Sequence, residues 1–182
     1  EALKRHMRAF EGQSGVIYCL TRKTVEEVCE KLIREGYPAT RYHAGLTPEE
    51  RKENQEAFIY DTKPIMVATN AFGMGIDKAD VRFVVHYNMP KDIESYYQEA
   101  GRAGRDGKQA ECLLLYDKSD IAVNTYLIGH DQPDLEWKDK ELKLLDKMIV
   151  YCNTSGCLRK YLLEYFGERV ASSCNNCGNC SQ

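Results

Sequence analysis

Four cysteines near the end of the chain have the spacing of a metal site. Three of them form the run Cys174-x-x-Cys177-x-x-Cys180, and Cys157 lies further upstream. Asparagine and glycine fill the gaps of the run, and both residue types tolerate the tight turns that a metal knuckle needs. Four thiolates suit tetrahedral Zn²⁺ and leave no open position for catalysis, so the predicted role of the metal is structural.

Two alternatives use the same cysteines. Disulfides or an iron–sulfur cluster could form here, but disulfides belong mainly to secreted chains, and this sequence carries no secretory signal. Cys152 competes with Cys157 for the fourth position, since the two cannot face one site from a straight helix. We prefer Cys157 because it is closer in sequence to the other three cysteines.

A second group with chemical potential is Gln98, Arg102 and Arg105. Their spacing of four and then three residues would place them on one face of a helix. Gly101 and Gly104 lie between them, and each glycine costs a helix about 1 kcal/mol relative to alanine. Small residues let another surface come close, and two fixed guanidinium groups suit a polyphosphate. The alternative is a solvated helix end.

A further ligand-facing loop is indicated by Gly75 and Asp77, which follow a predicted buried strand. Glycine beside an acid suggests a backbone that approaches a ligand closely, although an ordinary turn has the same composition. The sequence contains no G-x-x-x-x-G-K-[ST] phosphate loop and no adjacent acid pair placed to hold Mg²⁺. The arginines would therefore complete a nucleotide site that another lobe holds.

The elements that must position these groups alternate between strand and helix. Strands are predicted at 16–20, 39–42, 65–68, 82–86 and 110–116. Helices of ordinary length between them predict parallel βαβ units, so we expect a doubly wound sheet over 12–118 with helices on both faces. In such sheets the functional groups collect at the carboxyl ends of the strands. After Tyr116 only helices are predicted, at 117–128, 135–152 and 156–166.

Two helix starts can be predicted from capping residues. Thr24 with Glu27 has the spacing of a capping box, and Thr47 followed by Pro48 and Glu50 is a strong start signal.

Composition sets the outer limits. The 182 residues suffice for one α/β domain and a small appendage, with 43% hydrophobic and 29% charged residues. No apolar run approaches the roughly 20 residues that span a bilayer, and the first residues lack a signal peptide. We therefore expect no membrane partner and an intracellular protein, in the cytoplasm or nucleoid if the source is bacterial. The net charge of −3 argues against nucleic-acid binding. The argument is weak, because only the local charge of a binding groove matters.

The order of these motifs resembles that of the RecQ-type ATP-dependent DNA helicases. Segment 15–22 resembles helicase motif IV, and 42–46 resembles the loop between motifs IV and V. Segments 67–77 and 81–86 resemble motif V, and 95–107 resembles motif VI. The cysteine-containing tail resembles the zinc domain of the family. Gln98 stands where related RNA helicases carry histidine, and Leu158 stands where the family commonly has arginine.

The resemblance implies a second RecA-like lobe at 1–130 and a helical zinc-binding domain with a four-cysteine site at 131–182. It further implies a 3′-to-5′ DNA helicase motor that acts in recombination and repair on single-stranded DNA and duplex junctions. ATP and Mg²⁺ would be bound mainly by a first RecA-like lobe that this chain lacks. The chain alone is accordingly expected to be inactive.

The resemblance also assigns roles to single residues. Arg105 is implied as the arginine finger on the γ-phosphate, Arg102 as its support and Gln98 as an ATP sensor. Asp77, with Gly75 beside it, is implied near the ribose or in the link between ATP and DNA. The residues implied to face DNA phosphates are Arg22, His43 and Thr69.

Two other function classes stay open at this point. The chain could be a non-enzymatic module that only docks on nucleic acid or a partner, with the arginines as backbone contacts. It could also be a lobe of an RNA helicase, which Gln98 and the cysteine cluster oppose.

Overall fold

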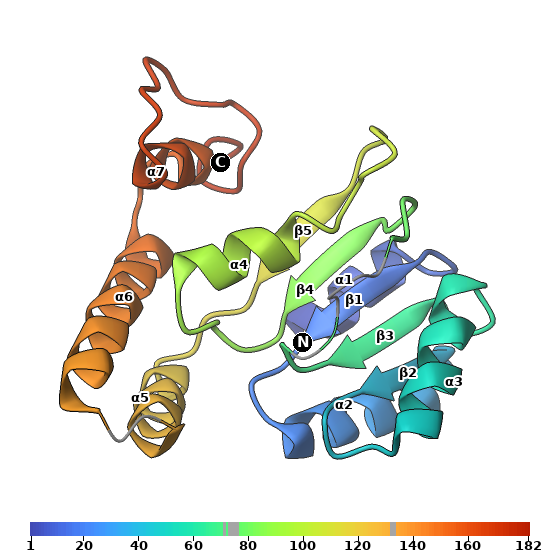
Figure 1. Cartoon of the computed structure of the whole chain (residues 1–182). Helices are drawn as coiled ribbons and strands as arrows, with labels where there is room; N and C mark the ends of the chain where they lie inside the picture. The colour runs from blue at the N-terminus through green and yellow to red at the C-terminus, as the bar shows by residue number, and fades with distance from the viewer. Residues whose placement is uncertain (71, 73–76, 132–133) are drawn as a thin grey trace. The chain divides into compact units, whose positions relative to one another are not determined.

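A computed structural model describes residues 1–70, 72, 77–131 and 134–182. The chain divides into two compact units, which are described one by one (Figure 1). The first unit comprises 1–89 and 98–120, and the second comprises 90–97 and 121–182. Helix α4 (Ile93–Ala100) runs from the second unit into the first.

The first unit is built on a parallel sheet of five strands in the order β2-β3-β1-β4-β5. The strands are β1 (Gly15–Tyr18), β2 (Ala39–Tyr42), β3 (Ile65–Ala68), β4 (Phe83–His86) and β5 (Glu111–Leu114). All four residues of β1, β3 and β4 are buried, as expected for strands that are covered on both faces. The predicted α/β class with a parallel sheet is confirmed.

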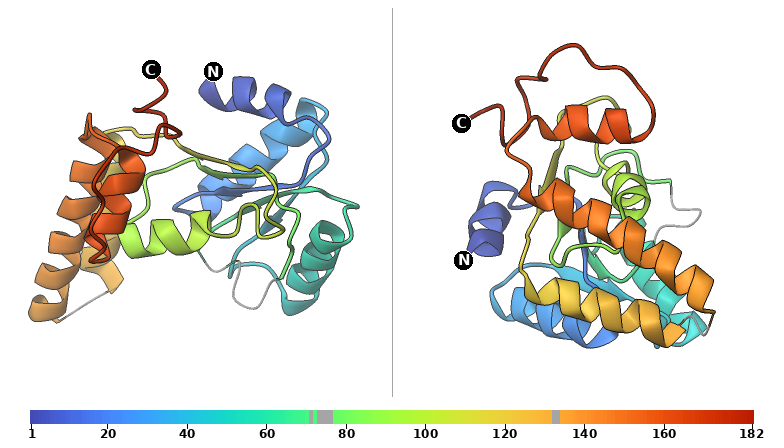
Figure 2. Two further views of the ribbon diagram at one scale, coloured as in Figure 1. Left: turned by 90° about the horizontal axis from the view of Figure 1, so that it is seen from above. Right: turned by 90° about the vertical axis from the view of Figure 1, so that its left-hand side faces the viewer.

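Helices cover both faces of this sheet (Figure 2, left). Helices α1 (Ala2–Ala9) and α2 (Arg22–Arg34) bury apolar side chains in one core, together with Ile17 and Val85 of the sheet. Helix α3 (Pro48–Ile59) contributes Phe58 to the core on the other face. Neighbouring strand residues contribute to opposite cores because side chains alternate along a strand.

The helix starts agree with one of the two capping predictions. Thr47 accepts a hydrogen bond from the backbone N–H of Glu50 at 3.1 Å, which confirms the predicted start of α3. The predicted capping box at Thr24 is wrong. Thr21 has an extended backbone and its hydroxyl accepts from the N–H of Thr24 at 3.2 Å, so α2 begins at Arg22.

The second unit is helical, as predicted. It contains α5 (Ser119–Asp131), α6 (Leu135–Asn153), α7 (Leu158–Tyr165) and the first residues of α4. Leu145, Met148 and Tyr151 form the buried face of α6, and the ring of Tyr151 contacts that of Tyr96 with centroids 5.6 Å apart. Among the helices that are described, none combines the length and the apolar character needed to cross a membrane.

Candidate nucleotide edge and metal centre

The sheet order brings three of the predicted site residues to one edge. Thr69 directly follows β3, His43 directly follows β2, and Arg22 begins α2 after β1. Because β3 lies between β2 and β1, these residues follow neighbouring parallel strands and share the carboxyl edge of the sheet. Arg22 is exposed, whereas Thr69 is buried.

His43 is buried and both of its ring nitrogens have partners. Gly45 donates its backbone N–H to Nδ1 at 3.1 Å, so the proton lies on Nε2, which donates to Glu26 at 2.8 Å. Desolvation would raise the pKa of Glu26, but hydrogen bonds from His43 and Arg41 outweigh it and lower that pKa. The ring therefore holds the loop at 43–46, and a direct contact of His43 with DNA stays a prediction.

Arg102 and Arg105 do not lie on a helix, which corrects the prediction of a common helical face with Gln98. Helix α4 ends at Ala100, and residues 101–107 form a series of turns that we call the arginine turn. Gly104 and Gly107 have φ values of +65° and +79°, and this left-handed backbone breaks a helix. Gln98 remains on α4 and is exposed.

The arginine turn is anchored to the segment before β4. Gly104 donates its N–H to the carbonyl of Val81 at 2.9 Å, and Asp106 donates its N–H to the carbonyl of Ala79 at 3.1 Å. The Asp106 carboxylate also binds the Arg82 guanidinium at 2.6 Å, and this ion pair lowers the pKa of Asp106. The turn is thus held by its backbone and by one largely buried ion pair.

Both arginines act electrostatically on Tyr18, the last residue of β1. Burial raises the pKa of the Tyr18 hydroxyl and Glu99 raises it further, whereas Arg102 and, more weakly, Arg105 work against this shift. Tyr18 is stacked on His86, the last residue of β4, with ring centroids 5.3 Å apart. The arginine turn therefore holds Arg102 within hydrogen-bonding reach of the Tyr18 hydroxyl, and Arg105 close enough to act on that hydroxyl through its charge.

The loop after β3 is described only in part. Asp77 is exposed, and the predicted ligand-facing Gly75 lies outside the described residues. Its neighbour Lys78 is buried and binds Asp61 and Asp80, which fixes the chain just after Asp77.

The metal centre lies in the second unit. The Sγ atoms of Cys157, Cys174, Cys177 and Cys180 all lie within 4.8 Å of one another, and the Cys174–Cys180 and Cys157–Cys177 sulfur pairs are each 4.0 Å apart. Zn–S bonds of about 2.3 Å in a tetrahedron need sulfur atoms about 3.8 Å apart, so a small contraction would accommodate Zn²⁺. Cys152 is not a member of this group.

Backbone amides prepare these thiols for a metal. The N–H groups of Lys160 and Cys174 lower the pKa of Cys157. Desolvation opposes the same effect at Cys177, but backbone N–H groups led by that of Leu158 lower its pKa to about 6. A hydrogen bond with the side chain of Cys177, and then desolvation, raise the pKa of Cys180 to about 11, because both favour its neutral thiol.

Asn179 ties the knuckle to the chain before α7. Its side-chain amide donates to the carbonyls of Thr154 and Gly156 at 2.9 and 2.8 Å. The sequence indicates this asparagine only as a turn former. It gives no sign of the Arg82–Asp106 pair either, because the two residues are far apart in the chain and each resembles an ordinary surface charge.

Solved structures support the fold class that this geometry defines. A DEAD box protein from the hyperthermophile Methanococcus jannaschii is 27% identical, with a TM-score of 0.59 over 71% of this chain and 35% of that protein. Residues 1–107 match the family described as helicase conserved C-terminal domain, and residues 118–181 match the RecQ zinc-binding family. The chain therefore belongs to the helicase C-terminal domain family, and within it to the RecQ helicases.

Curated relatives carry the same combination. The ATP-dependent DNA helicase RecQ of Bacillus subtilis is 51% identical over 93% of this chain, and the ATP-dependent helicase SGS1 of Saccharomyces cerevisiae is 43% identical over 94%. The chain spans only 28% and 12% of the length of these two relatives.

Proposed function

We propose that the chain is the second motor lobe, with its zinc-binding domain, of a RecQ-type ATP-dependent 3′-to-5′ DNA helicase that acts in recombination and repair. The observation that carries this proposal is the anchored arginine turn, whose two cations lie close to the hydroxyl of Tyr18 in a central strand. A triphosphate is the ligand that such a pair suits, and a phosphate loop is absent from the sequence. ATP and Mg²⁺ would therefore be held mainly by a separate first lobe.

In this mechanism Arg105 is the arginine finger and Arg102 supports it. Their charge meets the negative charge that develops on the transferred phosphoryl group, so they stabilise the transition state more than the bound ATP. Gln98 would sense the nucleotide, and Asp77 with Gly75 would face the ribose or link it to the DNA. Loss of phosphate weakens the attraction, the lobes part, and repeated closure moves the protein along single-stranded DNA.

The DNA track would use Arg22 and Thr69 at the same edge. Contacts to the phosphate backbone bring salt-sensitive binding with little sequence preference. We assign to His43 the task of positioning the loop at 43–46 through Glu26 and Gly45, next to that track.

Zn²⁺ would be held by Cys157, Cys174, Cys177 and Cys180 in a closed site. Its contribution is to stabilise a short tail that has little apolar core of its own. For the division of the chain we propose a lobe at 1–130 and a zinc domain at 131–182, which limited proteolysis with mass spectrometry of the fragments tests.

The test of the motor role is Arg105→Ala in the full-length helicase. An arginine finger contributes about 10³-fold or more to turnover, so DNA-stimulated ATP hydrolysis should fall by that order while ATP binding changes little. Arg34→Ala is the matched control, because Arg34 is an exposed arginine in the last turn of α2. ATP hydrolysis by Arg105→Ala within a fewfold of wild type would contradict the proposed role.

A non-enzymatic nucleic-acid module is the second candidate, and a reconstitution distinguishes it. The 182-residue chain should show no ATP hydrolysis alone and should gain it when the first lobe is added. Hydrolysis that stays absent with both lobes and DNA present would favour the docking module. Tighter binding of single-stranded RNA than DNA would favour an RNA helicase.

A further inference from the structure

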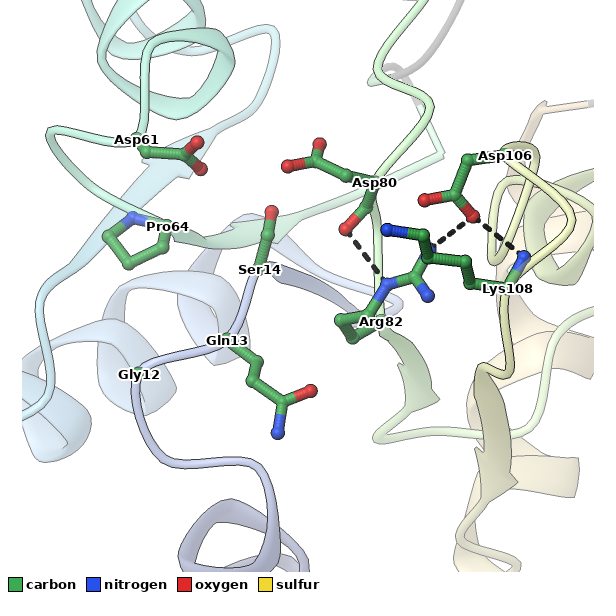
Figure 3. Close-up of a pocket in the computed structure, with 9 residues that line it drawn as sticks. All are labelled: Gly12, Gln13, Ser14, Asp61, Pro64, Asp80, Arg82, Asp106 and Lys108. Carbon is green, nitrogen blue, oxygen red and sulfur yellow. Dashed lines mark hydrogen bonds and ion pairs between the residues drawn. The ribbon is translucent and has the colours of Figure 1, made fainter.

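A cleft lies at the amino-terminal edge of the sheet, opposite the edge that carries Arg22, His43 and Thr69. It has a volume of about 450 Å³, which lies in the range of small-ligand sites (Figure 3). Three of its lining residues, Ser14, Pro64 and Arg82, directly precede β1, β3 and β4. The cleft is formed entirely within the first unit.

Two of the exposed charges of the cleft are carboxylates. The side chains of Asp61 and Asp80 are 54% and 58% exposed, and the Lys78 ammonium beneath them, which is 5% exposed, binds both at 2.9 and 2.8 Å. In each of these acids only Oδ1 takes part in that bridge, so Oδ2 has no ion pair among the described residues. The pKa of Asp80 is lowered, chiefly by its hydrogen bond from Lys78, so this carboxylate is charged.

The remaining charged residues that line the cleft are one acid, Asp106, and two bases, Arg82 and Lys108. Arg82 is bound by Asp106 and by the carbonyls of Asp80 and Gln109, so its guanidinium is taken up within the wall of the cleft. Lys108 lines the same cleft and makes no ion pair within the described part of the chain. With Lys78 beneath the cleft, the three acids and three bases have a net charge of zero. Two of the cations, Lys78 and Arg82, are already bound to acids.

A buried hydroxyl points into the same space. Ser14 is 6% exposed, and its Oγ has no hydrogen-bond partner among the residues that the structure describes. Figure 3 shows this hydroxyl directed between Asp61 and Asp80. A buried polar group without a partner is unfavourable, so a ligand that supplies a hydrogen bond here would be bound more tightly.

We propose that this cleft binds a guanidinium group, that of an arginine side chain. The acceptors are the Oδ2 atoms of Asp61 and Asp80 and the Oγ of Ser14, which surround the space rather than converge on one point. A planar guanidinium has five N–H donors in a fork and can reach separated acceptors, whereas an ammonium or a metal ion needs them around one centre. That centre is already occupied by the Lys78 ammonium.

The direct test is a titration of the ¹⁵N-labelled 182-residue chain with N-acetyl-L-argininamide, followed by NMR. Saturable shifts should appear at the amides of Ser14 and Asp61, and N-acetyl-L-lysinamide should bind more weakly. Free L-arginine is a separate arm, because it distinguishes an amino-acid ligand from the side chain of a partner protein. Binding of free arginine that is tighter than that of the blocked amide would assign the cleft to the amino acid.

Two variants test the acceptors. Asp61→Asn should weaken binding by about tenfold, since hydrogen bonds to charged groups contribute most. Asparagine also tolerates the φ of +59° at this position, so the fold should be kept. Ser14→Ala should weaken binding while the unfolding midpoint stays the same or rises, because the hydroxyl has no partner to lose among the described residues.

Two further variants complete the experiment: one removes a positive charge of the cleft, and the other changes an acid far from it in the sequence. Lys108→Gln should strengthen binding, since it removes a cation from the mouth of the cleft. Asp139→Asn, an exposed ion-paired acid on α6, should leave binding unchanged. Unchanged affinity in both Asp61→Asn and Ser14→Ala, or saturable shifts at the same amides with inorganic phosphate instead of the arginine amide, would overturn the proposal.

Discussion

At the scale of single residues, the proposed zinc centre depends on more than its four sulfur atoms. Backbone amides of the chain around α7 donate to Cys157 and Cys177, so the loop must hold its shape for these amides to lower the pKa of the two thiols. Asn179 fixes that shape by donating to two carbonyls before α7. Its position between two cysteines makes it part of the knuckle without being a ligand.

We therefore predict that Asn179→Asp weakens zinc retention by about tenfold, as outer partners of metal sites commonly do when they are lost. A carboxylate cannot donate to the two carbonyls and would repel them. The measurement is a competition titration with a chromophoric chelator. Asn176→Asp is the control, because the Asn176 side chain makes no hydrogen bond in the described structure. Equal zinc affinity of the two variants would contradict the role of Asn179.

The cysteines themselves give a second prediction at this scale. Cys157→Ser should release zinc or lower it well below one ion per chain, because a closed site needs all four thiolates. Cys152→Ser should keep one zinc per chain, since Cys152 is outside the sulfur cluster. Elemental analysis of zinc in the purified variants decides between Cys157 and Cys152 as the fourth ligand. Loss of zinc from Cys152→Ser but not from Cys157→Ser would assign the fourth position to Cys152.

At the scale of elements, the arginine turn depends on a particular backbone conformation. Its backbone needs a left-handed residue at Gly104, and a Cβ there would lie 2.9 Å from the carbonyl oxygen of Lys108. The glycines that interrupt the predicted helix are thus what allow the turn to fold back on the segment at 79–81. The same turn presents Arg102 and Arg105.

Gly104→Ala should destabilise the chain by about 1–3 kcal/mol, because strain at a left-handed position adds to the clash with backbone. Gly36→Ala is the matched control. Gly36 has a φ of +90° but open space around its Cβ position, so only the backbone strain remains. The free energies of unfolding in urea give the difference between the two variants. In the full-length helicase, Gly104→Ala should also lower ATP hydrolysis. Normal turnover would show that the arginines do not need this shape of the turn for their role.

At the scale of the whole molecule, one buried histidine should make stability depend on pH. His6 of α1 contacts Phe83 of β4, and burial lowers its pKa from 6.5, although the nearby Glu111 works in the opposite direction. Below pH 6.5 the unfolded chain binds a proton that the folded chain still excludes. The contribution of His6 is therefore full above pH 6.5 and is lost as the pH falls toward its lower folded pKa.

Urea unfolding between pH 5 and 7.5, roughly the range in which histidine titrates, tests this prediction. The free energy of unfolding should fall on the acid side, and His6→Phe should flatten that fall. His130→Gln, at an exposed histidine, should keep the wild-type slope. Stability that rises on acidification would mean that the attraction to Glu111 outweighs burial.

Much of the architecture was predictable because it is written in local patterns. An apolar run predicted the strand at 65–68, and Thr47 with Pro48 marked the start of α3. The predicted start at Thr24 was wrong because Thr21, three residues earlier, has the extended backbone of the helix cap. The predicted helix face shared by Gln98, Arg102 and Arg105 was wrong because helical spacing was extended through glycines that end the helix.

The sequence by itself determined the alternation of strands and helices, the cysteine knuckle and the pair of arginines, since each depends on neighbours within a few residues. Only the tertiary structure decided that Asp106 binds Arg82, that Cys157 reaches the knuckle, and that Ser14 points into a cleft between two acids. The physical reason is that such contacts join residues far apart in the chain, and in the first unit they depend on which strand ends lie side by side. The order of parallel strands, which no short stretch of sequence specifies, decides that arrangement.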